Sequence, residues 1–100
     1  MPDPRIFPIT SVNDTFATVG VVSTEILAAN RNRVDCDFTN DSEQVIYLAR
    51  GNAAVIGSGI RLNARGGSYR IGTNNLFYGA VNAICADGDA NISISEGYLP

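Results

Sequence analysis

The stretch GSGIRLNARGGSYRIG, residues 57–72, combines five glycines with three arginines, a composition that could hold a phosphate group. A dinucleotide-binding turn needs a third glycine three residues after its second one, and Leu62 occupies that position. The other common phosphate loop needs a lysine after its last glycine, and the chain contains no lysine. This stretch therefore predicts no nucleotide site.

Two aspartates and two cysteines are the remaining groups that could take part in catalysis. Asp35 and Asp37 alternate with apolar residues, so a strand would place both carboxylates on one face, about 7 Å apart. Paired carboxylates can act as acid and base, but a solvated acidic stripe is the commoner origin of this pattern. The aspartates would raise the pKa of the Cys36 thiol, and the apolar neighbours of Cys85 would do the same. Because the chain also lacks histidine, we expect no enzyme.

Metal ligands and cofactor motifs are sparse. Asp87-Gly88-Asp89 begins like a calcium loop, but the glutamate that should close such a loop is missing. The two cysteines lie far apart in the sequence, so we expect no metal site and no cofactor. Each cysteine stands in an apolar strand pattern, which favours a buried free thiol. A disulfide would require the two strands to be neighbours.

The composition fits one folded domain. The chain has 100 residues, of which 45% are hydrophobic and 17% charged. A formal net charge of -3 gives no reason to bind nucleic acid. No run of about 18 apolar residues and no signal-peptide pattern occurs, so we expect no membrane contact and synthesis in a cytoplasm. All seven basic residues are arginines, which suit contacts between proteins, although a bias of the source genome would give the same result.

Alternation of apolar and polar residues predicts the elements that must position any site. Residues 33–40 give the cleanest pattern, with Val34, Cys36 and Phe38 on the core side. Residues 45–49 are continuously apolar, as in a strand covered on both faces. About eight short strands with frequent turns predict an all-β fold, a single antiparallel β-sandwich or barrel that is jelly-roll-like, with no helix of three turns.

Two tight turns are expected to join hairpins. Strands at 60–62 and 69–71 would pair across residues 63–67, where two successive glycines would supply positive backbone angles. Asp87-Gly88-Asp89 would be the turn of a second hairpin. Gly79 lies inside an apolar run and is expected to bend its strand or form a bulge.

Residues 1–14 are expected to form an extended arm, followed by the β-sandwich domain at residues 15–100. Three prolines remove backbone donors there and favour neither a helix nor a central strand; they are Pro2, Pro4 and Pro8. Three apolar side chains in the arm would need a surface to cover them; they are Ile6, Phe7 and Ile9. Two interpretations stay open: a tail that frays or folds back on its own domain, and an arm that clasps a neighbouring subunit.

The order of four sequence blocks resembles a small β-domain found among the virion proteins of tailed bacteriophages. The blocks are ILAANRNR at 26–33, the segment 40–48 that ends in IYL, GIRLNARGGSYRI at 59–71, and the segment 79–97 that begins with GAVNAI and ends with EG. Together they cover about residues 16–98 and leave only the proline-rich arm outside. None of them is a catalytic signature, so the resemblance implies a fold and a setting rather than a reaction.

The resemblance implies a structural virion protein, most similar to a capsid decoration (cement) protein or a head-fibre protein. Such a protein sits on the outer capsid surface, so the implied partners are the major capsid protein and further copies of the chain, with a homotrimer favoured. An acidic chain fits a surface that faces water. The alternative is a receptor- or carbohydrate-binding module of a fibre, which would gather Phe77, Tyr78 and Tyr98 around one groove.

We expect the partner-facing residues in the arm and in the hairpin at 57–72. They are Arg5, Ile6, Phe7, Ile9, Arg61, Arg65 and Arg70. For the three hairpin arginines the alternative is a solvated side chain on an exposed strand face.

Overall fold

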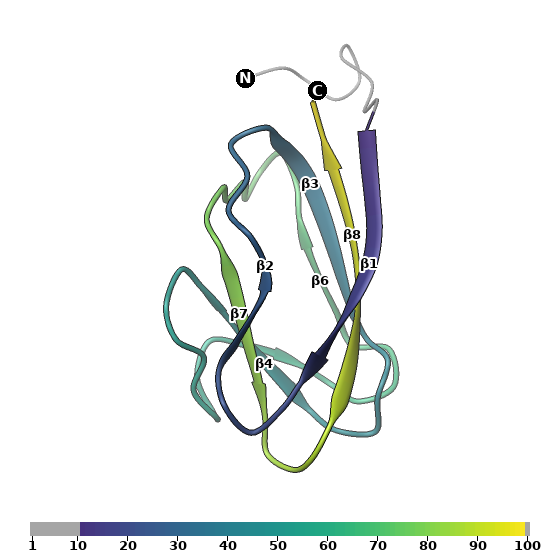
Figure 1. Cartoon of the computed structure of the whole chain (residues 1–100), viewed down its shortest axis with the longest axis vertical. Helices are drawn as coiled ribbons and strands as arrows, with labels where there is room; N and C mark the ends of the chain where they lie inside the picture. Colours follow the sequence, from purple (N-terminus) through teal and green to yellow (C-terminus); the bar gives the residue numbers. More distant parts are fainter. Residues whose placement is uncertain (1–10, 100) are drawn as a thin grey trace.

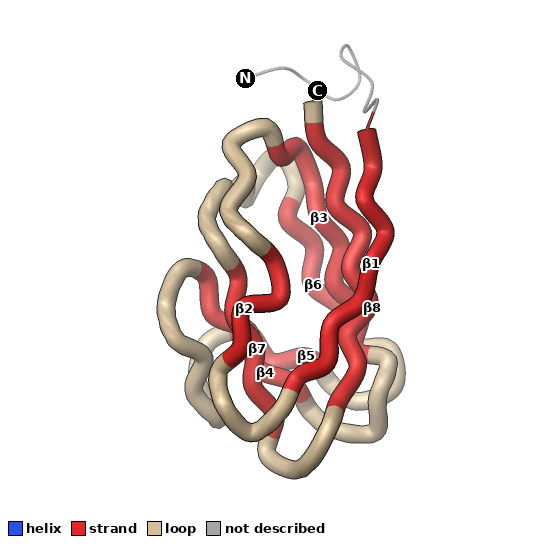
Figure 2. The backbone as a smooth tube through the Cα atoms, in the orientation of Figure 1, coloured by secondary structure: helices blue, strands red, loops and turns tan. Residues whose placement is uncertain are grey.

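Eight strands assemble into two four-stranded antiparallel sheets that pack as a sandwich (Figure 1). A computed structural model of the chain describes residues 11–99. Every regular element in this range is a strand (Figure 2). The strands are β1 (Ser11–Val19), β2 (Thr24–Leu27), β3 (Arg33–Asn40), β4 (Ile46–Arg50), β5 (Ile60–Leu62), β6 (Ser68–Ile71), β7 (Val81–Cys85) and β8 (Ala90–Tyr98).

The order of the strands is that of a jelly roll. The first sheet has the order β1-β8-β3-β6 and the second sheet has the order β2-β7-β4-β5. The chain crosses between the sheets at every connection except the one from β4 to β5, which are neighbours in the second sheet. Two such sheets of four strands form the jelly-roll architecture. The predicted fold class is therefore confirmed, in its sandwich form rather than as a closed barrel.

The core lies between the sheets and follows from the period-two pattern. In β3, Cys36 and Phe38 are fully buried, and in β8 Ile92 and Ile94 alternate with partly exposed serines. The second sheet adds Ile46, Leu48, Leu62, Val81, Ala83 and Cys85 to the same cluster. Apolar burial of this kind is the main free-energy term that favours the fold.

The two expected hairpins are wrong in their pairing. β5 pairs with β4 in the second sheet, whereas β6 pairs with β3 in the first sheet. The turn at 87–89 likewise joins β7 of one sheet to β8 of the other. Alternation reports which face of a strand is buried, and it does not report the partner strand. The same pattern therefore fits a hairpin and a crossing between sheets.

The crossing at 63–67 also uses its glycines differently from the expectation. The positive backbone angles fall on Arg65, with a φ of 59°, and on Gly66, with a φ of 109°. Gly67 is needed for space, because a Cβ there would collide with the backbone nitrogen and oxygen of Asn63.

Three further expectations about elements change in the structure. Residues 11–14 belong to β1, where Ser11 pairs with Tyr98, so the expected arm boundary after residue 14 lies inside a strand. In β4 burial alternates, and the run at 45–49 is not covered on both faces. Gly79 precedes β7 instead of bending it, and its missing side chain leaves room for the Phe77 ring.

Candidate interaction surfaces

Arg33 is a buried charge at the start of β3 that closes one end of the sandwich. Its side chain is inaccessible to solvent, and Nε donates to Oε2 of Glu96 at 2.7 Å. Nη1 donates to the carbonyl oxygens of Phe77 and Gly79 at 2.7 and 3.0 Å, and Nη2 donates to that of Ala28 at 2.6 Å. One guanidinium thus binds β8 and two loops to β3.

A bulge places Arg33 in this position. Arg33 pairs with Tyr98 and Asp35 pairs with Gly97, so two residues of β3 correspond to one step of β8. The extra residue lets Arg33 and Val34 both be buried. Sequence reasoning missed this site. Its detectable signal was Glu96, a carboxylate on the inward face of β8, where Ala90, Ile92 and Ile94 are also buried.

Asn40 holds the opposite end of β3 in a similar way. Its side-chain nitrogen donates to the carbonyl oxygens of Gln44 and Leu62 at 2.6 and 3.2 Å, and its oxygen accepts from the Ser42 hydroxyl at 2.6 Å. Its backbone groups bind the N–H of Gly66 and the carbonyl of Gly67. The crossing from β5 to β6 is therefore fastened to β3, and both polar ends of this strand have structural roles.

The aspartates of β3 lie on the outer face of the first sheet together with Arg70. Nη1 of Arg70 lies 3.0 and 2.9 Å from the two carboxylate oxygens of Asp37, and Nη2 lies 3.2 Å from Oδ2 of Asp35. Asp35 also accepts the N–H of Gly97. The predicted acidic stripe is thus bridged by an arginine from the neighbouring strand β6.

Both cysteines are free and buried, as their strand positions predict. Burial raises the pKa of the Cys36 thiol from 9.0 to about 12, and the lowering effect of Arg33 is too small to prevent this rise. Glu96 and the two aspartates of β3 raise it further, so the effect foreseen for the aspartates is present but secondary to burial. Burial also raises the pKa of the Cys85 thiol. A raised pKa keeps both thiols protonated, so neither is activated as a nucleophile.

The structure separates the arginines that were expected to share one hairpin face. Arg61 is exposed on β5 of the second sheet, and Arg70 is bound to acidic side chains on the first sheet. Arg65 is exposed in the crossing, with Nη2 3.1 Å from Oε1 of Glu43. The four arm residues expected to contact a partner lie outside the described residues; they are Arg5, Ile6, Phe7 and Ile9.

Two hollows on the described surface contain acid–arginine pairs of this kind. One has a volume of about 420 Å³ and includes Asp35 and Arg70. Another has a volume of about 490 Å³ and includes Glu43 and Arg65. In each hollow the arginine is bound to the carboxylate beside it.

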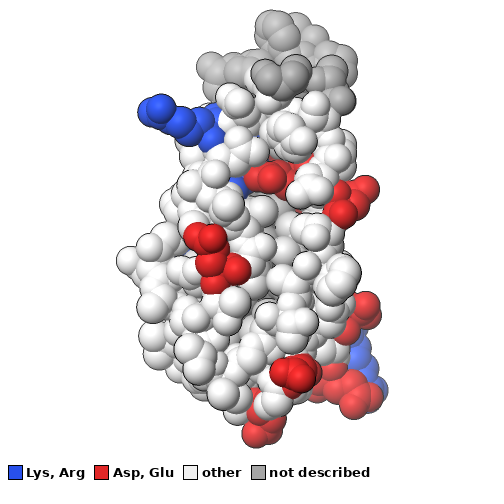
Figure 3. Space-filling view, viewed as in Figure 1, with Lys and Arg blue, Asp and Glu red and all other residues white. Residues whose placement is uncertain are grey.

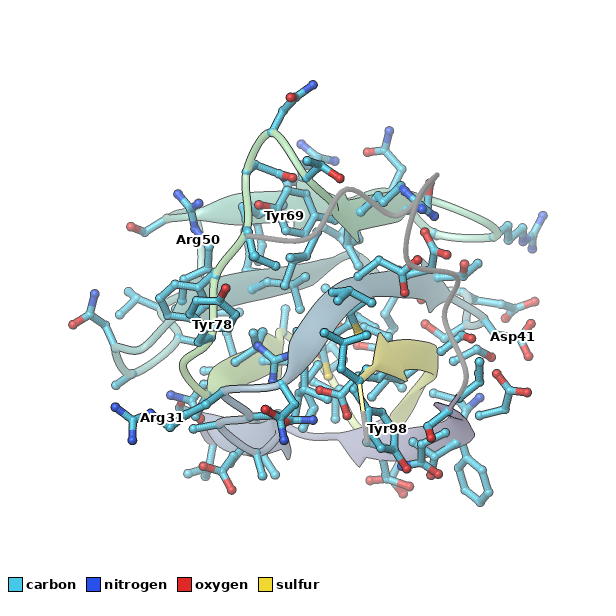
Figure 4. The ribbon with its side chains drawn as sticks, turned by 90° about the horizontal axis from the view of Figure 1, so that it is seen from above. Arg31, Asp41, Arg50, Tyr69, Tyr78 and Tyr98 are labelled. Atoms are coloured by element: carbon cyan, nitrogen blue, oxygen red, sulfur yellow. The ribbon has the colours of Figure 1, made fainter. Side chains whose placement is uncertain are left out.

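The aromatic side chains proposed for a fibre module do not converge. Phe77 is partly buried and packs against the core. Tyr78 and Tyr98 lie well apart when the molecule is seen from above (Figure 4). No shared aromatic groove forms from these three residues.

Exposed apolar side chains gather instead on two neighbouring loops. Val21 and Val22 lie in the turn from β1 to β2, and Val55 and Ile56 lie in the loop from β4 to β5. The Ser23 hydroxyl accepts the N–H of Ala54 at 2.8 Å and ties the two loops together. We call these four apolar residues the loop patch. The surface over these loops, at the lower left of Figure 3, carries hardly any charge.

The second exposed feature is β1, which pairs only with β8 among the described strands. Two large apolar residues present their side chains on its outer face, Val12 with a relative exposure of 56% and Phe16 with one of 69%. The free side of this strand, residues 11–19, is called the β1 edge below. It begins beside the end of β8, where both ends of the described chain lie (Figure 1).

The described residues include no group of three or more His, Cys, Asp or Glu side chains that could hold a metal ion. The same part of the chain contains no helix with the length and apolar character needed to span a membrane. Comparisons with protein-family models, with curated proteins and with solved structures found no match for this chain.

Proposed function

We propose that the chain is a structural virion protein of a tailed bacteriophage, made in the cytoplasm of the bacterial host, that binds the outer capsid surface as a decoration protein. The order of the four sequence blocks supports the setting. The jelly roll supports it by analogy, because viral capsid domains are among those that use this architecture. The partner is the major capsid protein, and the protein stabilises the shell through contacts between subunits.

The loop patch is the observation that carries this proposal. Four exposed apolar side chains lie together on two loops, and the hydrogen bond from Ala54 to Ser23 fixes one loop against the other. An apolar patch that is held in place before binding loses little entropy when a partner covers it. We assign this surface to the contact with the capsid protein.

Shell stabilisation follows if several copies bind together. Each loop patch supplies one contact, and copies joined to one another must release all their contacts before any of them dissociates. A trimer remains the expected assembly, because a closed ring presents several equivalent patches to one site on the shell. The activity is mechanical and needs no catalytic group.

Co-sedimentation with purified capsids of the encoding phage, stripped of this protein, tests the proposal. Val22→Asp and Val55→Asp each place a charge in the loop patch, and each is expected to weaken binding at least about tenfold. Ser68→Asp is the matched control, because it adds the same charge at an exposed position on β6. It should leave binding unchanged.

Wild-type protein that fails to sediment with the shells would overturn the proposed function. Equal binding by the loop-patch variants and the control would remove this patch from the capsid contact. Thermal unfolding of each variant checks that the fold is intact.

A further inference from the structure

The β1 edge differs from the three other sheet edges in the described structure. Those edges are formed by short strands: β2 has four residues and a register shift, β5 has three and carries exposed Arg61, and β6 has four and carries exposed Arg70. Short length, bulges, prolines and charged side chains, lysine above all, are among the devices by which proteins block strand addition at a sheet edge. β1 has nine residues in unbroken register with β8, and it contains neither a proline nor a basic residue.

An edge of this kind is built to accept another strand. The outer face of β1 presents Val12 and Phe16 to solvent, with Asp14 between them as the only charged residue of the strand. The Ser95 hydroxyl donates to Oδ1 of Asp14 at 2.6 Å and holds this carboxylate on the outer face. Strand addition would supply backbone hydrogen bonds along the edge and contacts for these side chains.

The sequence that precedes β1 has the donor pattern of a terminal strand. Its three prolines occupy only even positions, namely Pro2, Pro4 and Pro8. Successive N–H groups of a strand point to opposite edges, so the missing donors would all fall on one edge. The odd residues from 3 to 9 keep every donor on the other edge. If this segment formed a strand, it could pair with another strand along the edge that keeps its donors. The missing donors would prevent a further strand from pairing along the opposite edge.

We propose that residues 3–9 of one copy add as a fifth strand to the β1 edge of a neighbouring copy. The segment runs directly into its own β1, so pairing with that same strand would require a reversal and leave only a few residues to pair. A neighbouring copy imposes no such limit. This inference deepens the proposed function, because it names the contact that joins copies on the shell.

Side-chain complementarity selects the register. If Arg5 lies opposite Asp14, the one basic residue of the segment meets the one charged residue of β1. Phe7 then lies opposite Val12 in an antiparallel pair or opposite Phe16 in a parallel pair. In both directions an apolar residue of the segment covers an exposed apolar residue of β1.

The contact is heterologous, since donor segment and acceptor edge are different parts of the chain. Heterologous contacts close into rings when the rotation between neighbours permits it. In a ring of three copies, each copy would give its segment to one neighbour and receive the segment of the other. Every β1 edge would then be paired with a strand.

Synthetic peptides of residues 2–10 test the inference on the full-length protein. The unmodified peptide should dissociate the oligomer, measured by light scattering. N-methylation at Phe7 removes a donor that faces β1 and should abolish competition, whereas N-methylation at Ile6 removes a donor that faces away and should not. Both modifications leave the side chains intact. Equal competition by the two methylated peptides, or a full-length protein that is monomeric at millimolar concentration, would overturn the inference.

Charge reversal supplies an independent test. Arg5→Asp and Asp14→Arg should each weaken the oligomer about tenfold or more, and the double variant should recover most of the loss. No recovery in the double variant counts against the assigned register and partner.

Capsid binding separates this inference from the proposed function. If deletion of residues 2–10 abolishes capsid binding but leaves the mass in solution unchanged, the segment binds the capsid protein and the inference is wrong. If the deletion yields monomers and the intact protein binds no capsid, the inference stands and the proposed function fails.

Discussion

Arg33 illustrates how much of this small fold depends on single buried side chains. Its guanidinium is enclosed at one end of the sandwich, where Glu96 and three backbone carbonyls satisfy its donors. A buried charge is costly unless it is paired, so the two residues depend on each other. The pair also holds the loops around Phe77 and Ala28. Loss of either residue should therefore disturb these loops as well.

Glu96→Ala is expected to lower the free energy of unfolding by about 3–5 kcal/mol, because Arg33 would keep its charge without a carboxylate. Glu96→Gln should cost clearly less, since the amide oxygen can still accept from Nε of Arg33. Urea unfolding at neutral pH measures both values. Equal losses for the two variants would contradict this expectation and would show that the charge of Glu96, rather than the hydrogen bond that it accepts, stabilises the fold.

The raised pKa of the Cys36 thiol leads to a prediction about the stability of the protein at alkaline pH. This pKa rises from 9.0 to about 12 in the folded protein, so between these values the folded state holds a proton that the unfolded state has lost. The resulting stabilisation is fully present below pH 9 and is lost as the pH rises toward 12, by about 4 kcal/mol over the whole interval. Urea midpoints at pH 8 and 10.5 should reveal the decline.

Cys36→Ala is the control for this decline. The variant is expected to be less stable at every pH because it leaves a small cavity, but its stability should fall less steeply above pH 9. The same slope in both proteins would contradict the assignment to Cys36.

At the scale of elements, the crossing from β5 to β6 is the connection on which the sheet order depends. Asn40 binds its backbone from β3, and Gly67 packs directly against Asn63. Had these residues formed a hairpin, β5 and β6 would lie side by side in one sheet. Instead the crossing carries the chain from the edge of the second sheet to the edge of the first.

Gly67→Ala should therefore destabilise the protein by about 1–3 kcal/mol, because the added methyl group collides with backbone that cannot move aside cheaply. Gly20→Ala is the matched control, since a Cβ at Gly20 meets no atom within 4 Å. The control should change stability by less than about 0.5 kcal/mol. Thermal unfolding compares the two, and similar midpoints would argue against a tight crossing.

Alternation in the sequence was sufficient to predict strands such as β3 and β8, because burial of every second residue leaves a direct trace in residue type. It could not predict their partners, since a strand looks the same in a hairpin and in a crossing. The Arg33 site escaped prediction for a related reason: a bulge turns one charged residue inward, and only the folded register reveals it. The predicted partner arginines proved scattered because they depended on the hairpin that does not form.

At the scale of the whole molecule, two parts of the surface stand out because their exposed side chains are apolar. Several arginines are bound to carboxylates of the same domain, namely Arg33, Arg65 and Arg70. In the described residues, the large apolar side chains that are exposed lie in the loop patch and on β1, apart from Tyr78 in the loop before β7. We infer that the loop patch binds the shell while the β1 edge joins neighbouring copies, so two different surfaces would hold each subunit in place.

Imaging of capsids tests this account most directly. Stripped capsids of the encoding phage, incubated with the purified protein and examined by electron cryo-microscopy, should carry added density on their outer surface with the two loops against the capsid protein. Val22→Asp should leave that density weak or absent. Capsids that stay bare with the wild-type protein, or density that contacts the shell through the outer face of β6 and β3, would contradict the account.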